Sequence, residues 1–306
     1  MTGATGFVLN HDNEGINCLD EPVAVSAVDG ASVLVPSYVN EITLQTATGS
    51  GNWSLLLGSG IFADAVADDG RATYFFSAAD NGSATFNLSY PEGDPLVDVD
   101  VFQSDDITVR DNEAEGLLRF APSGFTLTQN LLPNPPPTPI NDPLVTQTAG
   151  ADFPMHISAY GVTDDDPQCG VIEAYSGSRD IKFSMNHVNP VTSPRVATVN
   201  GIAVVTNPAA ATSQPVAFVA GQAAVSVAYK DVGEINLRVE DDVSFPTTMA
   251  GGTNNFVVKP ASLAVTLVEG AGGEINFAPD LMTEERFVPA GDSFVVEVSS
   301  LDTDGD

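Results

Sequence analysis

Two stretches of the sequence repeat one another: Gly82-Ser-Ala-Thr-Phe-Asn-Leu-Ser-Tyr90 and Gly221-Gln-Ala-Ala-Val-Ser-Val-Ala-Tyr229. Both run from a glycine to a tyrosine with the same spacing, and apolar residues alternate with polar or small ones, which is typical of a half-buried β-strand. A second alternating stretch follows each copy, at 97–101 and at 235–239. The pattern predicts an all-β fold of tandem immunoglobulin-like β-sandwich modules.

The repeats also divide the chain into parts. Three similar openings occur, at Gly6-Phe-Val-Leu9, Gly124-Phe-Thr-Leu127 and Leu263-Ala-Val-Thr266. We therefore expect an Ig-like sandwich at residues 1–117, a second sandwich at 118–258, and the start of a third, incomplete β module at 259–306. The junctions should fall near 115–122 and 255–260. The Pro-rich stretch 133–139 should form an extended surface loop of the second module.

The charge balance excludes two classes of partner. The chain has 10 Lys and Arg against 41 Asp and Glu, a net charge of −31. Nucleic-acid binding requires clustered basic residues, which this sequence lacks. No apolar run approaches the ~20 residues that span a bilayer. We therefore expect neither nucleic-acid binding nor membrane insertion by this chain.

The two cysteines, Cys18 and Cys169, fall one in each predicted module. Three states fit this arrangement: a bridge between the modules, disulfides to partners outside the sequence, or free thiols. The sequence leaves these alternatives open.

Calcium is the one cofactor for which the sequence offers candidate ligands, because Ca²⁺ binds clustered carboxylate oxygens. The candidates lie in three acidic clusters; they are Asp164, Asp166, Asp241, Asp242, Asp302, Asp304 and Asp306. The last cluster has acids at alternate positions, like the beginning of a calcium loop. The alternative is that all three are solvated acidic loops, which is the more frequent outcome at this composition.

No residues form a recognisable catalytic motif. The histidines His11, His156 and His187 lack zinc-ligand spacing, and no serine lies in a Gly-x-Ser-x-Gly sequence. We therefore predict no catalytic residues. Trp53 could stack on a sugar, but the single Trp of a sandwich is more often buried in its core.

Several motifs carry a family resemblance. Gly51-Asn-Trp-Ser-Leu-Leu-Leu-Gly-Ser-Gly60 resembles a bacterial Ig-like module. Phe120-Ala-Pro-Ser-Gly-Phe125, Tyr229-Lys-Asp-Val-Gly233 and Gly252-Thr-Asn-Asn-Phe-Val-Val-Lys-Pro260 resemble the large domain of unknown function in MshQ-like proteins. Those proteins are associated with biogenesis of the mannose-sensitive haemagglutinin type IV pilus. Such domains tend to have a second cysteine near residues 183–189, and this sequence has none there.

The resemblance implies a large bacterial protein that is secreted or displayed on the cell surface. The first hypothesis is a non-enzymatic stalk of serial β-sandwiches associated with a pilus or with cell attachment, whose partners are other modules or pilus components. The second is a ligand-binding module of a larger secreted protein, which recognises glycans through loops at one sandwich end, with or without calcium. An aromatic-lined concave pocket would favour the second hypothesis.

Overall fold

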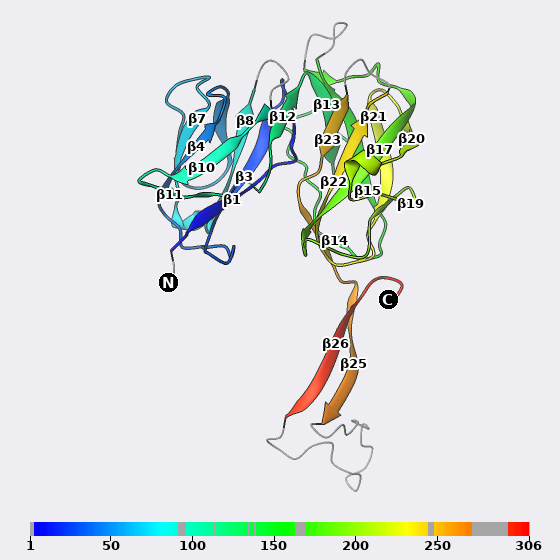
Figure 1. The fold of residues 1–306 in the computed structure, drawn as a ribbon. Coiled ribbons are helices and arrows are strands. Elements are labelled where there is room, and N and C mark those ends of the chain that lie inside the picture. Colours follow the sequence, from blue (N-terminus) through cyan, green and yellow to red (C-terminus); the bar gives the residue numbers. More distant parts are fainter. Residues whose placement is uncertain are drawn as a thin grey trace.

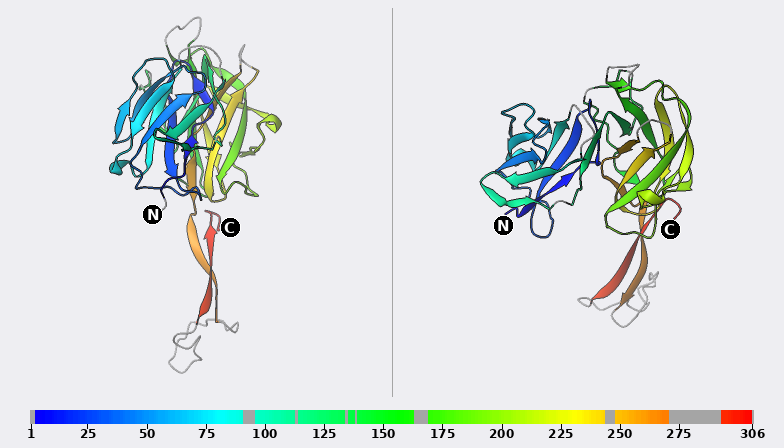
Figure 2. Two further views of the ribbon diagram at one scale, coloured as in Figure 1. Left: turned by 60° about the vertical axis from the view of Figure 1, so that its left-hand side comes forward. Right: turned by 45° about the horizontal axis from the view of Figure 1, so that its top comes forward.

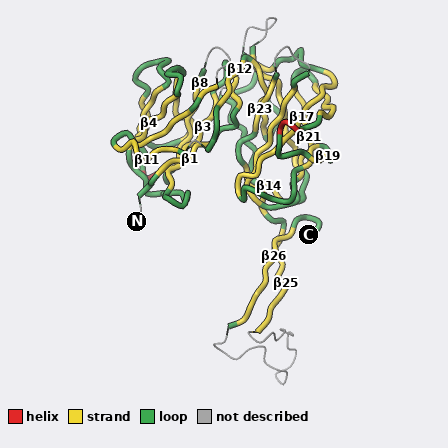
Figure 3. The backbone as a smooth tube through the Cα atoms, in the orientation of Figure 1, coloured by secondary structure: helices red, strands yellow, loops and turns green. Residues whose placement is uncertain are grey.

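The computed structural model describes residues 3–90, 96–112, 114–133, 135–137, 139–162, 169–243, 248–270 and 293–305. Two β-sandwich modules lie next to each other, and a two-stranded hairpin extends away from the second (Figure 1). Helical residues in these ranges are confined to the 3₁₀ turns Ala78–Asp80 and Pro208–Ala210 (Figure 3). No helix in the described part of the chain could cross a membrane. The predicted tandem all-β sandwich fold is confirmed.

The first module consists of a nine-stranded sheet, in the order β5-β8-β3-β1-β11-β10-β4-β7-β6, and a three-stranded sheet, β2-β12-β9. Buried side chains from both halves of the large sheet form one core, which includes Val25, Leu44 and Phe86. The strands are β1 (Gly6–Asn10), β2 (Glu14–Ile16), β3 (Glu21–Val28), β4 (Glu41–Thr46), β5 (Asn52–Leu57), β6 (Ile61–Ala63), β7 (Arg71–Phe75), β8 (Ser83–Ser89), β9 (Leu96–Val97), β10 (Val99–Gln103), β11 (Asp106–Asp111) and β12 (Leu118–Ala121).

The second module has two facing sheets, β13-β15-β21-β18-β19 with β16 on β15, and β14-β24-β22-β17-β20 with β23 on β22. Its core lies between them and includes Met155, Phe183 and Val239. The strands are β13 (Ser123–Thr128), β14 (Gln147–Thr148), β15 (Phe153–Gly161), β16 (Gly170–Val171), β17 (Gly177–Asn189), β18 (Thr198–Val199), β19 (Ile202–Ala203), β20 (Ser213–Phe218), β21 (Gln222–Ala228), β22 (Gly233–Asp241), β23 (Met249–Gly252) and β24 (Phe256–Lys259).

The sequence repeat corresponds to a structural repeat. The first copy forms β8, which pairs with β3, and β3 pairs with β1. The second copy forms β21, which pairs with β15, and β15 pairs with β13 in the same antiparallel sense. Both copies begin with a glycine of positive φ, +78° at Gly82 and +81° at Gly221. Only glycine adopts this backbone conformation without strain, so the conserved spacing from glycine to tyrosine marks the turn into the same strand.

The predicted start of the second module at residue 118 is a few residues early. Strand β12 pairs with β2 and β9 of the first module. The side chains of Leu118 and Phe120 are fully buried in the first core. The chain changes module at Pro122, within the predicted junction 115–122, because β12 is needed to complete the smaller sheet.

Past β24, the chain forms the antiparallel hairpin of β25 (Ser262–Gly270) and β26 (Phe294–Leu301) (Figures 1 and 2). This pairing has the same sense as β1 with β3 and β13 with β15. Residues 259–306 as the start of a third module remain a prediction. The described residues of the Pro-rich stretch 133–139 lie outside any strand.

Candidate ligand cleft between the two modules

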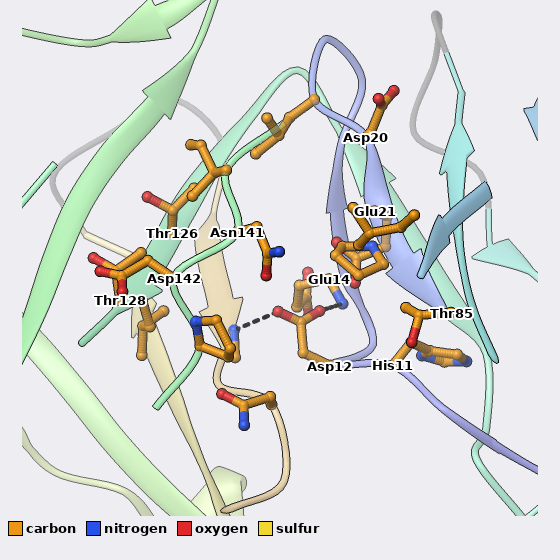
Figure 4. Close-up of a pocket in the computed structure, with 18 of the residues that line it drawn as sticks. His11, Asp12, Glu14, Asp20, Glu21, Thr85, Thr126, Thr128, Asn141 and Asp142 are labelled. Carbon is orange, nitrogen blue, oxygen red and sulfur yellow. Dashed lines mark hydrogen bonds between the residues drawn. The ribbon is translucent and has the colours of Figure 1, made fainter. Parts of the chain in front are cut away.

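A cavity of about 310 Å³ lies where the two modules meet (Figure 4). The first module contributes the residues around the end of β1, the start of β3 and the exposed leucine of β5. The second contributes β13, the segment leading to Pro143, and Gly252. The polar side chains of the lining are Asn10, His11, Asp12, Glu14, Asp20, Glu21, Thr85, Thr126, Thr128, Asn141, Asp142 and Asn254.

Asp12 connects the two modules at the base of this cleft. One carboxylate oxygen accepts a hydrogen bond from the backbone N–H of Glu14 at 2.8 Å. The other accepts one from the backbone N–H of Gly252 at 3.3 Å, across the junction. Figure 4 shows both bonds as dashed lines. The carboxylate thus satisfies a donor at the end of β23 and fixes that strand against the first module.

The close approach at this point requires glycine. A Cβ atom on Gly252 would lie 2.7 Å from the Cβ of Asp12 and 2.9 Å from its carbonyl oxygen. Both distances are shorter than real Cβ contacts. Any larger residue at 252 must therefore push the modules apart or distort β23.

Replacing Gly252 by alanine tests this contact. We expect Gly252→Ala to lower the free energy of unfolding by about 1–3 kcal/mol, the usual cost of overpacking a close-packed site. It should also accelerate amide exchange at residue 252, because the bond to Asp12 lengthens. Gly30→Ala is the matched control, since the nearest atom to its added Cβ lies 3.8 Å away. Equal stability of the two variants would contradict the proposed contact.

Glu21, the first residue of β3, is buried beside Asp12. The Asp12 side chain is half-buried at the edge of the cavity. This burial raises the pKa of Asp12 to about 7. Burial, and then the charge of Asp12, raise the pKa of Glu21 well above its ordinary value. Two buried carboxyls this close cannot both be ionised at low cost, which favours a proton held between them.

Glu14 forms the ion pairs of the junction. It pairs with Arg238 of β22 in the second module, and at 3.9 Å with Arg119 of β12 in the first. Burial raises the pKa of Glu14, and the charge and hydrogen bond of Arg238 act against this rise. Because Glu14 is largely buried, loss of Arg238 would leave a poorly solvated carboxylate at the junction.

His11 of the lining is a buried histidine, and one of its ring nitrogens has no partner in the described part of the chain. The residue is only 8% exposed. Its Nδ1 accepts a hydrogen bond from the backbone N–H of Asn13 at 3.2 Å, and its Nε2 has no hydrogen-bond partner among the described residues. Burial lowers the pKa of His11 to about 4, so the ring is neutral at physiological pH. Since Nδ1 accepts, Nε2 carries the ring proton and is a donor without an acceptor.

The cysteines join the modules covalently. Cys18 and Cys169 form a disulfide with their Cα atoms 5.7 Å apart, which resolves the three alternatives left by the sequence. Beside the bridge, Ile16 of the first module packs with Tyr160 and Val171 of the second in a small buried cluster. The junction therefore combines a covalent bond, apolar packing, an ion pair and a hydrogen bond.

The predicted calcium ligands do not come together in the described residues. Asp241 is fully buried and accepts a hydrogen bond from the Tyr175 hydroxyl. Asp242 pairs with Lys182 at 2.5 Å, and Asp304 pairs with Lys230 at 2.5 Å. The backbone N–H of Asp304 donates to Asp302. Asp164, Asp166 and Asp306 lie outside the described residues. Within the described ranges, no three potential metal ligands cluster.

We expect calcium to have no selective effect on stability. If the aspartates act only as charged surface groups, 1 mM Ca²⁺ should shift the melting temperature no more than Mg²⁺ at equal ionic strength. A site with a Kd near ~10⁻⁴ M would instead stabilise its module by about 1.4 kcal/mol at ~1 mM Ca²⁺. Calorimetry with each ion distinguishes these results. A calcium-specific rise that Asp164→Ala removes would contradict our expectation.

Trp53 does not line the cleft. It is 4% exposed in the first core, and its indole N–H donates to the Gly70 carbonyl at 3.0 Å. The interpretation of Trp53 as a core residue is therefore confirmed, and this side chain is not available to stack on a sugar.

The comparisons with known proteins agree with the fold. Residues 108–254 match the family model described as "Domain of unknown function (DUF6701), first Ig-like domain". The match includes β13 to β23, so the second module is an Ig-like module. No curated protein matches the chain.

Three solved structures of bacterial proteins illustrate the structural matches. The D0-D1 domain of intimin is 9% identical, with 83% of this chain and 100% of that chain covered and a TM-score of 0.29. The Yersinia pseudotuberculosis adhesin InvE is 10% identical, with 88% and 69% covered and a TM-score of 0.25. Invasin, titled a bacterial integrin-binding protein, is 12% identical, with 88% and 43% covered and a TM-score of 0.24. Whole chains superpose poorly at such scores, so nothing further rests on these matches.

Proposed function

We propose that the chain is a non-enzymatic structural segment of a bacterial surface protein, in which serial β-sandwiches form a stalk for attachment. The observation that carries this proposal is the junction. A disulfide, the Asp12–Gly252 hydrogen bond and the Glu14–Arg238 ion pair all cross it. Modules fixed at several points resist bending, which is what a stalk requires.

The disulfide supports an extracellular or cell-surface location. Disulfides persist in oxidising compartments and are rare in the cytosol, where thiols are kept reduced. The net charge of −31 adds solubility and prevents close association with other acidic surfaces. The partners that fit this role are further modules of the same surface protein.

The proposal of a pilus link rests on the resemblance to MshQ-like proteins in the motifs around residues 120–125, 229–233 and 252–260. Two of these motifs lie at the junction. Gly252 makes the close contact with Asp12, and the chain passes from one module to the other within residues 120–125. As the finer form of the proposal, we propose that the chain belongs to a pilus-associated attachment protein.

The stalk proposal is tested by replacing the gene segment in the bacterium that encodes the chain. Deleting the segment that encodes residues 1–258 should reduce attachment to a surface. Replacing it with two unrelated, disulfide-linked Ig-like modules of similar length should restore attachment, because a stalk acts through length and stiffness. If the replacement is displayed on the surface but does not restore attachment, the segment acts through specific contacts and the stalk proposal fails.

A second candidate function, ligand binding, is favoured by one observation, the cavity at the junction. Its position differs from the loop-end site expected from the sequence. Three acidic side chains of the lining already have partners: Asp12 and Asp142 accept from backbone N–H groups, and Glu14 pairs with Arg238.

A further inference from the structure

The hairpin of β25 and β26 projects away from the second module (Figures 1 and 2) and has an exposed apolar face. Directly paired residues share one face of a sheet, and Val265 pairs with Val298, as Leu263 pairs with Ser300. Val296 lies two positions before Val298 and therefore points to the same face. The side chains of Leu263, Val265, Val296 and Val298 are 45–69% exposed. A two-stranded hairpin with such a face is marginally stable by itself in water.

The corresponding face is buried in both modules. The pairing of β25 with β26 has the register of β1 with β3 and of β13 with β15, so the equivalent positions can be identified one by one. The equivalents of the four exposed residues are at most 7% exposed; they are Phe7, Leu9, Val23 and Val25 in the first module, and Phe125, Leu127, Met155 and Ile157 in the second. The positions that form a sandwich core in two modules are therefore exposed in the hairpin.

A strand with the Gly-to-Tyr pattern lies beside these positions in each module. Strand β8 pairs with the second edge of β3, and β21 pairs with the second edge of β15. Each places an alanine and then a larger apolar residue in the same register; the pairs are Ala84–Val25 and Phe86–Val23 in the first module, and Ala223–Ile157 and Val225–Met155 in the second. Within the described residues, β26 pairs with β25 alone. Its second edge has the position that β8 and β21 fill in the modules.

One backbone hydrogen bond is common to both filled edges. In the first module, the N–H of Ala27 donates to the carbonyl of Gly82 at 2.9 Å. In the second, the N–H of Ala159 donates to the carbonyl of Gly221 at 2.8 Å. The acceptor in each case is the glycine that begins the Gly-to-Tyr pattern, so this bond fixes where the added strand starts.

Ser300 is the residue of β26 that corresponds to these two alanines. The carbonyl of the next residue, Leu301, accepts a hydrogen bond from the N–H of Ala261 on the β25 side at 2.9 Å. Successive residues of a strand direct their backbone groups to opposite edges. The N–H of Ser300 therefore faces the second edge of β26, as the equivalent N–H groups do in the modules.

Neither this sequence nor a second copy of the chain supplies the missing strand. No tyrosine follows Tyr229, so the Gly-to-Tyr pattern has no third copy after β21 in the 306 residues. The two copies that exist are internal strands: β8 lies between β5 and β3, and β21 lies between β15 and β18. A second copy of the chain could donate either strand only by opening its own core.

We infer that β26 is an acceptor for one further β-strand, which carries a third copy of the Gly-to-Tyr pattern. This strand pairs antiparallel with β26, places a small residue opposite Val298 and a larger apolar residue opposite Val296, and accepts a hydrogen bond from the N–H of Ser300. Strand addition of this kind combines main-chain hydrogen bonds with recognition of alternate side chains. The inference goes beyond the stalk proposal, because it assigns a binding surface. Its source, a further module of the same surface protein, rests on the proposed function.

The test is an NMR titration of the oxidised, ¹⁵N-labelled chain with synthetic peptides. The probe has the sequence of residues 221–229, and the control peptide has the same composition with its apolar residues moved out of alternation. The probe is added up to about 2 mM, because a single short strand binds modestly. We expect saturable shifts of β26 amides, including Ser300, with the probe alone. Absence of these shifts, or equal shifts with the control peptide, overturns the inference.

A matched pair of variants locates the binding face. Val296→Ser removes an apolar side chain from the proposed face and should weaken binding of the probe about tenfold. Val295→Ser changes the neighbouring exposed valine, which lies on the opposite face, and should leave binding unchanged. If the hairpin does not form in Val296→Ser, Val298→Ser replaces it, with the same expected loss. Equal affinities of the two variants overturn the assignment to this face.

The same spectra identify a different occupant. If a second copy of the chain covers the face, β26 amides shift as the protein concentration rises without peptide, and the proposed partner is wrong. Failure of the peptide to bind leaves the stalk proposal intact, because that proposal is decided by bacterial attachment. Loss of the stalk proposal in turn leaves peptide binding to β26 measurable, so the two failures are distinguishable.

Discussion

Replacing both Cys18 and Cys169 by alanine is expected to destabilise the chain by about 2–4 kcal/mol. The bridge joins residues 151 positions apart, so it restricts the unfolded chain strongly. It also holds Ile16 against Tyr160 and Val171, and loss of the bridge lets this small cluster open. The effect should therefore appear both in the free energy of unfolding and in the motion of the two modules relative to each other.

Denaturant unfolding measures the first effect, with each module followed separately because unfolding can be stepwise. The wild-type chain in reducing agent is the internal control, since it loses the bridge but keeps both thiols. It should behave like the double variant. If the double variant unfolds at the same denaturant concentration as the oxidised wild type, the bridge does not stabilise the junction.

Replacing Glu21 by glutamine is expected to change how stability depends on pH. The pKa of Glu21 is raised in the folded chain, so the folded state holds a proton that the unfolded state releases above about pH 4.5. The wild type therefore loses stability as pH rises, at up to ~1.4 kcal/mol per pH unit for one proton. This loss continues until pH passes the raised, folded-state pKa. Glu21→Gln cannot ionise and avoids this loss.

The direction in which stability changes with pH is clearest in the difference in stability between Glu21→Gln and the wild type. Asp12, whose pKa rises to about 7, contributes a loss of the same sign between about pH 4 and 7. His11 contributes the opposite sign, because its pKa falls to about 4 and its stabilisation is lost as pH drops from 6.5 towards 4. Subtraction removes the His11 contribution that both chains share.

Melting curves between pH 5 and 8 check this prediction. Glu21→Gln should become progressively more stable than the wild type as pH rises. Glu41→Gln, which removes an exposed carboxylate on β4, should give a constant difference. A constant difference for Glu21→Gln as well would mean that the Asp12–Glu21 pair does not hold a proton.

Most of the fold could be predicted from local pattern. The two Gly-to-Tyr stretches are β8 and β21, because alternation at period two reports which face of a strand is buried. The module to which strand Leu118–Ala121 belongs could not be predicted in the same way. Alternation identifies a strand but does not identify its partner, and β12 pairs with strands that lie about 20 and 100 residues earlier.

The site was missed for a related reason. Sequence analysis singled out acids that are adjacent, such as Asp241 and Asp242, and these proved to pair with nearby Tyr and Lys side chains. The acids that matter at the junction, Asp12 and Glu21, are nine positions apart, and Asp12 packs against Gly252, which lies 240 residues later in the sequence. One signal was available. Single cysteines in two predicted modules were consistent with a shared junction, although other pairings fitted equally.

The central claim is that the two modules behave as one rigid body, and ¹⁵N relaxation of the oxidised chain tests it most directly. We predict one rotational correlation time for amides of both modules, the same in β3 and β8 as in β17 and β22. The Cys18→Ala, Cys169→Ala variant should show faster tumbling in each module. Two different, shorter correlation times in the oxidised wild type would show that the modules move independently and would contradict the account.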